Sequence, residues 1–161
     1  MLRQSHLSTE EGVYGLILVA GLVSVAGSTN LGPVRTLAFV VITVFVFWAA
    51  HVYAGTVAEH SGSAGVGVSL RAAATHAVRR SRGLLAATVP PAIPLVLSAF
   101  GVFGAKAADW IALWIIVAVL ALLGYLAYRR KNAPLHMRMV GAVSTAAFGV
   151  VIILAKALLH H

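Results

Sequence analysis

Long apolar segments separated by short polar ones dominate the pattern of this chain. The apolar segments lie near residues 12–27, 34–58, 83–103, 109–128 and 139–159. Each is close to the length of roughly 20 residues that an α-helix needs to cross a hydrocarbon layer about 30 Å thick. The pattern therefore predicts one all-α domain that spans the whole chain, a polytopic membrane helix bundle with five transmembrane helices.

The longest polar connection, residues 60–82, begins with small residues and becomes basic. Ser69 is a suitable N-cap for a short helix in its second half. Apolar residues recur at helical spacing on one face of this segment, which is typical of an amphipathic helix. The opposite face of this helix is predicted to carry Arg71, Thr75, Arg79 and Arg82, with His76 and Arg80 beside them. We expect a short amphipathic helix at the cytoplasmic membrane surface.

The distribution of basic residues predicts the orientation. The chain has 12 Lys and Arg, 4 Asp and Glu, and a net charge of +8. If the amino terminus is cytoplasmic, only Arg35, Lys106 and Lys156 fall outside, and the positive-inside rule favours that arrangement. We therefore expect a bacterial inner-membrane protein with its carboxy terminus outside. The arginines expected to contact anionic lipid head groups are Arg71, Arg79, Arg80 and Arg82.

Two expectations concern the outer ends of the helices. Asp109 precedes an apolar segment, so we expect it to cap that helix and to pair with Lys106 in the loop. Lys156 lies near the end of the last segment and is expected to extend to the outer surface.

The composition excludes several functional classes. The chain has no cysteine, which removes disulfides and thiolate metal sites. Its four acidic residues, Glu10, Glu11, Glu59 and Asp109, lack the spacing of a catalytic carboxylate pair or a metal clamp. No phosphate-binding loop, nucleophile elbow or nucleic-acid motif is present. We expect no enzymatic activity, no cofactor, no metal site and no nucleic-acid partner.

His51 is the most unusual polar residue, because it lies in the apolar run FVFWAAHVYAGTVAEH. Ionisable residues inside membrane segments are costly and often functional. His51, Gly55 and Glu59 are spaced by four and share a helix face, with His60 next to Glu59. A separation of eight residues is about 12 Å along a helix, too far for one metal ion. This spacing suits stations along a proton or cation path.

The third apolar segment contains TVPPAIP, in which three prolines remove backbone donors. We expect either a break there, with free carbonyl groups of the kind that transporters use for cation sites, or a packed kink that only shapes the bundle. Counting residues along each predicted helix places this break near the depth of His51. The hydroxyl groups of Tyr14, Tyr125 and either Ser144 or Thr145, on the first, fourth and fifth segments, are predicted to lie at a similar depth. The resulting candidate path consists of His51, Glu59, His60, Tyr14, Tyr125, Thr88, Pro90 and Ser144.

Two functions are consistent with these features. One is an oligomeric proton- or cation-conducting channel or transporter subunit, since a five-helix chain of this size encloses little by itself. The other is a membrane-embedded scaffold or accessory subunit without transport activity, in which His51 only forms a hydrogen bond with Tyr14 or a freed carbonyl. Gly141, Thr145 and Gly149 recur every four residues in the last segment, which predicts a close helix contact.

The run VFWAAHVYA, followed by a basic segment and a proline-containing span, resembles small actinobacterial integral membrane proteins of uncharacterised function. The resemblance implies a recurring multi-pass architecture. It assigns no activity and no functional residue.

Overall fold

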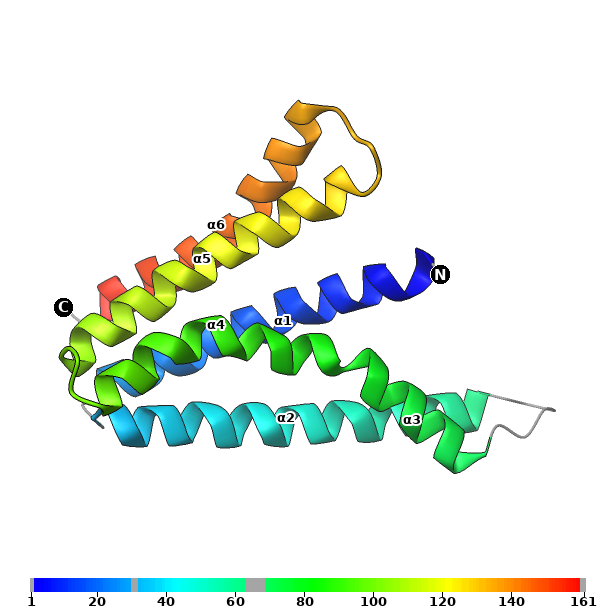
Figure 1. Cartoon of the computed structure of the whole chain (residues 1–161), viewed down its shortest axis with the longest axis horizontal. Coiled ribbons are helices and arrows are strands. Elements are labelled where there is room, and N and C mark those ends of the chain that lie inside the picture. The colour runs from blue at the N-terminus through cyan, green and yellow to red at the C-terminus, as the bar shows by residue number, and fades with distance from the viewer. Residues whose placement is uncertain (1, 30–31, 63–68, 160–161) are drawn as a thin grey trace.

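The computed structural model describes residues 2–29, 32–62 and 69–159, and every regular element in these ranges is a helix (Figure 1). The helices are α1 (Leu2–Ser28), α2 (Pro33–Gly62), α3 (Leu70–Arg80), α4 (Arg82–Ala99), α5 (Ala105–Arg129) and α6 (Leu135–Leu159). The all-α prediction is confirmed.

Five helical runs are long and apolar enough to cross a membrane, as the sequence predicted. They are Glu10–Ser28, Pro33–His60, Leu70–Ala99, Ala105–Arg129 and Leu135–Leu158. The third run begins well before the predicted residue 83, because α3 and α4 follow each other directly. The helix α1 also begins earlier than the predicted residue 12, since no glycine or proline interrupts its first turns. The orientation in the membrane stays a prediction.

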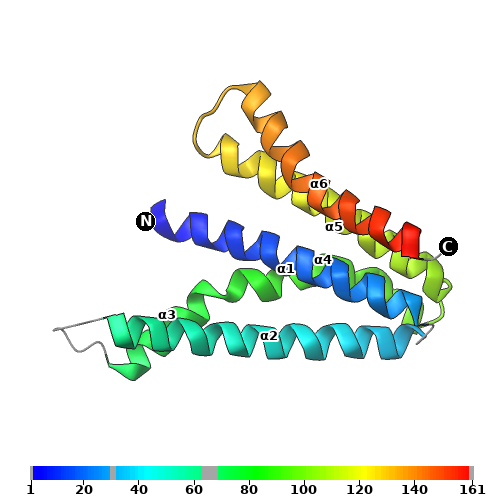
Figure 2. The ribbon, with the colours of Figure 1, turned by 180° about the vertical axis from the view of Figure 1, so that it is seen from behind.

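The first helix is the centre of the bundle. It contacts α2, α4, α5 and α6, and the run Glu10–Ser28 is the most buried of the five. Its inward face carries Leu16, Val19, Ala20 and Val23, each fully or almost fully buried. In two opposite views, α2 lies on one side of α1 and the α5–α6 hairpin on the other (Figures 1 and 2).

A glycine brings α1 close to α4. A Cβ atom on Gly15 would lie 3.0 Å from the Leu84 carbonyl oxygen and 3.1 Å from the Ala87 Cβ. Such distances are tighter than ordinary van der Waals contact, so only the missing side chain lets these two backbones approach. This contact sets how closely α1 packs against α4.

Small residues also join α5 to α6, as predicted from Gly141, Thr145 and Gly149. A Cβ on Gly124 of α5 would collide with the Gly141 carbonyl and the Thr145 hydroxyl of α6. The Thr145 hydroxyl lies 2.8 Å from the carbonyl oxygen of Leu120, which it reaches across the helix interface. The predicted close contact is therefore internal, between α5 and α6.

The expected break at the three prolines is wrong. The helix α4 continues from Arg82 to Ala99 with Pro90, Pro91 and Pro94 inside it. The chain is interrupted earlier, at Ser81, which separates α3 from α4 (Figure 1). The Ser81 side chain is buried, and its hydroxyl donates to the Ala77 carbonyl at 2.9 Å, so the interruption is held in place by a local hydrogen bond.

We predict that Gly124→Ala destabilises the protein. The added methyl group must push α6 away from α5, and overpacking of this kind costs roughly 1–3 kcal/mol. The control is Gly21→Ala, since a Cβ on Gly21 meets nothing within 4 Å. Unfolding in detergent, followed by circular dichroism, measures both variants. Equal stability of the two variants would show that the α5–α6 contact is not tight.

Candidate functional site

A buried carboxylate on α1 forms the centre of the candidate site. The Glu11 side chain is only 7% exposed, and its Oε1 lies 3.3 Å from Nε of Arg80 and 3.8 Å from Nε2 of His51. Neither carboxylate oxygen accepts a hydrogen bond from the described part of the chain. Glu11 thus forms an ion pair with Arg80 and lies close to His51, so α1, α2 and α3 meet at this carboxylate. We call Glu11, His51 and Arg80 the Glu11 cluster.

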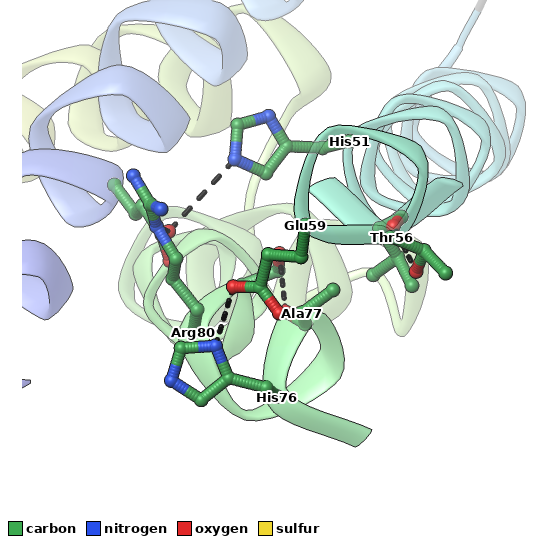
Figure 3. Close-up of polar contacts among 9 residues, drawn as sticks. His51, Thr56, Glu59, His76, Ala77 and Arg80 are labelled. Carbon is green, nitrogen blue, oxygen red and sulfur yellow. Dashed lines mark hydrogen bonds and ion pairs between the residues drawn. The ribbon is translucent and has the colours of Figure 1, made fainter. Parts of the chain in front are cut away.

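The packing of α1 explains why Glu11 turns inward. Glu11 lies one helical turn before Gly15 and on the same face, which packs against α4. Arg80 is the last residue of α3 and reaches back toward α1, while His51 approaches from α2 (Figure 3). Burial of a charged carboxylate is costly without a partner, and the guanidinium of Arg80 supplies the opposite charge.

A second polar side-chain pair lies beside the Glu11 cluster and joins α3 to α2. His76 Nδ1 and Glu59 Oε1 are 2.6 Å apart (Figure 3). Next to them, a Cβ on Gly55 would lie 3.4 Å from the Ala77 Cβ. His51, Gly55 and Glu59 thus all face α1 or α3, and the prediction that they share one helix face is confirmed.

A third ion pair lies near the opposite ends of α1, α5 and α6, where the sequence-based expectations were wrong. Asp109 does not cap α5, whose N-cap is Gly104, but lies buried within the helix. Its partner is Lys156 of α6, with Nζ 4.0 Å from Oδ2. Lys156 is equally buried and does not extend to the surface, because a charged carboxylate lies within its reach in the bundle. Lys106 is exposed.

Gly27 of α1 and Trp110 of α5 pack closely around this pair. A Cβ on Gly27 of α1 would collide with both charged groups, so α1 passes directly over them. The Lys156 ammonium also lies 5.7 Å from the ring centroid of Trp110, a distance typical of a cation–π contact. Asp109 and Lys156 therefore join α5 to α6 as an ion pair, and α1 packs over them at Gly27.

The other predicted path residues do not join His51. Tyr14 is 65% exposed, and His60 and Ser144 are exposed as well. Thr88 and Ser144 donate their hydroxyl protons to carbonyls of their own helices, those of Leu84 and Gly141. Pro90 and Tyr125 are half-buried. Of the eight predicted residues, the structure places His51 and Glu59 in polar clusters with α3.

The sequence did contain a signal for Glu11. Glu11 precedes Gly15 by four residues and Val19 by eight, so it belongs to the helix face that carries the small and apolar core residues. Helix periodicity extended by one turn would have placed it inside the bundle. No similar signal identified Arg80 or Lys156 as partners, because each pairs with a residue far away in the sequence.

The described residues contain no group of three or more His, Cys, Asp or Glu side chains that could hold a metal ion. Comparisons with protein-family models, curated proteins and solved structures gave no match to this chain. The resemblance to actinobacterial membrane proteins stays a prediction.

We predict that Asp109→Asn and Lys156→Met each lower the stability strongly, because each removes the opposite charge beside a buried ionised group. The cost of breaking such a pair is roughly 3–5 kcal/mol. In the double variant both charges are gone, so its loss should be smaller than the sum of the two single losses. Unfolding in detergent measures all three variants. Additive losses would mean that the two charges do not interact.

Proposed function

We propose that this protein is a subunit of an oligomeric proton channel or proton-coupled transporter, in which Glu11 binds and releases the proton. The observation that supports this function is the Glu11 carboxylate itself, which is buried between three helices with its Oε1 within 4 Å of both Arg80 and His51. Ionisable groups placed inside membrane segments often belong to proton relays.

The proposed step is a proton transfer between Glu11 and His51. A protonated imidazole gives the proton on Nε2 to Oε1 of Glu11, which leaves a neutral imidazole and a neutral carboxylic acid. The two atoms are 3.8 Å apart, so a small side-chain motion or one water molecule is needed to connect them. The His51 side chain is 43% exposed and can exchange its proton with the surroundings, while the Glu11 side chain is buried.

The fixed charge of Arg80 favours protons over metal cations as the transported species. Arginine stays protonated at all physiological pH values. Its Nε lies 3.3 Å from the Glu11 carboxylate and occupies the position that a metal cation would take. A proton bonds covalently to a carboxylate oxygen and gives a neutral acid. It therefore does not need the position that Arg80 occupies, whereas a metal cation does.

The exposed side of α2 is the surface that a neighbouring subunit of the proposed oligomer would use. Much of α2 is exposed, including Ile42, Phe45, Val46 and Tyr53. These residues recur at helical spacing along one side of the helix, at the edge of the bundle (Figure 1). A neighbouring subunit packed there would cover this apolar side of α2, which lies opposite the side that carries His51.

A scaffold without transport activity is the alternative. It is favoured by the hydroxyl groups of Thr88 and Ser144, which are satisfied within their own helices and not aimed at His51. In that case the Glu11 cluster serves only to hold α1, α2 and α3 together.

We predict that Glu11→Gln abolishes proton flux. Glutamine keeps the shape of the side chain but cannot carry a proton, so flux in proteoliposomes should fall at least about tenfold. A pH-sensitive dye inside the vesicles measures the flux. The matched control is Glu10→Gln, which removes the same charge from the exposed neighbouring position.

His51→Ala tests the second group of the relay in the same assay and should slow the flux without unfolding the helices. Gel filtration and circular dichroism confirm that each variant is folded. Wild-type protein that conducts no more than protein-free vesicles, or a Glu11→Gln variant that conducts normally, would favour the scaffold.

A further inference from the structure

The helix α3 carries an open groove on its outward face. The groove has a volume of about 370 Å³, and its lining residues are Arg71, Ala74, Thr75, Val78, Arg79 and Arg82. These positions recur every three or four residues, so they form one continuous side of the helix. We call this surface the arginine groove. It contains three of the four arginines that the sequence assigned to lipid head groups.

The opposite side of α3 faces the bundle. Ala73 and Ala77 are buried there. Arg80 contacts Glu11, and His76 contacts Glu59, both on the side away from the groove. These contacts fix the rotation of α3 about its axis, so the arginine groove always faces outward. The fourth predicted arginine, Arg80, therefore serves the Glu11 cluster and not the groove.

The charges of the groove are not neutralised by the protein. Within the described residues, no ion pair joins a carboxylate to Arg71, Arg79 or Arg82, and the ion pairs found involve His51, His76, Arg80 and Lys156. The Thr75 hydroxyl donates to the Arg71 carbonyl at 2.7 Å, so the three guanidinium groups supply the groove with donors. Guanidinium groups bind phosphate through paired, charge-assisted hydrogen bonds.

An apolar strip begins where the groove ends. Arg82 is the first residue of α4, and the exposed side of that helix continues through Ala86, Val89, Ile93 and Leu97. Val89 and Ile93 are 61% and 55% exposed. The spacing of three or four residues keeps this strip on one side of α4. A phosphate-binding groove thus leads directly onto an apolar surface.

We propose that the arginine groove binds the phosphate of an anionic phospholipid, whose acyl chains lie along the exposed strip of α4. A free phosphate ion would use the groove alone, whereas a phospholipid uses both surfaces. The adjoining apolar strip is therefore the reason to assign the site to a lipid. This site is separate from the Glu11 cluster and does not depend on proton transport.

The test compares two double variants of the full-length protein in detergent. Arg71→Gln with Arg79→Gln removes two charges from the groove. Arg129→Gln with Lys131→Gln removes two exposed charges from the α5–α6 connection, at the same end of the molecule (Figure 1). Native mass spectrometry measures the binding of phosphatidylglycerol to each. Each basic residue near a membrane surface contributes about fivefold to the affinity for an anionic lipid, so the loss of two should weaken binding to the groove variant roughly thirtyfold. The control variant should bind the lipid nearly as well as wild type.

Two further measurements identify the source of the phosphate. Ile93→Ser should weaken phosphatidylglycerol binding by interrupting the apolar strip, and inorganic phosphate in excess should not displace the lipid. An equal loss in both double variants would overturn the groove as a specific site. Displacement by inorganic phosphate would reduce it to a free-anion site, and equal binding of phosphatidylcholine would overturn the preference for an anionic lipid.

Discussion

Ionisable side chains inside an apolar bundle require partners from other helices, because lipid offers no alternative solvation. The first helix meets this requirement near both ends. Glu11 contacts Arg80 and His51 at one end, and Gly27 passes over Asp109 and Lys156 at the other. The position of α1 therefore determines the positions of α2 and α3 at one end and of α5 and α6 at the other. Between these ends the described helices pack mainly through apolar residues, with close contacts at Gly15 and Gly124 and a hydrogen bond from Thr145 to Leu120.

The short helix α3 connects the proposed proton site with the proposed lipid site. Its inward side supplies Arg80 to Glu11 and His76 to Glu59, and its outward side carries Arg71, Arg79 and Arg82. Because a helix is rigid over 11 residues, movement of one side moves the other. A lipid that holds the outward side would also hold Arg80 in place. The two sides of α3 thus differ in their contacts, since one packs against the bundle and the other carries the proposed lipid site.

The periodicity of the apolar residues and the positions of the turn-forming residues were sufficient to predict the helical architecture. The five apolar runs, the N-cap Ser69 and the shared face of His51 and Glu59 follow from local sequence. The Ser69 side chain does accept a hydrogen bond from the Ala72 amide, at 3.3 Å. The prolines of α4 were misleading, because packing against α1 and α5 retains a helix that would be broken in isolation. The candidate site was found only in part, since depth along a helix does not tell which way Tyr14 or Ser144 points.

The sequence by itself determined an all-helical chain with five runs able to cross a membrane, because hydrophobic length and helix period are local properties. The tertiary structure alone decided which charges meet. Glu11 and Arg80 are distant in the sequence, as are Asp109 and Lys156, and α1 packs closely near both pairs, against α4 at Gly15 and over the Asp109 and Lys156 side chains at Gly27. Long-range pairing is set by the packing of whole helices against one another, and no local pattern records it.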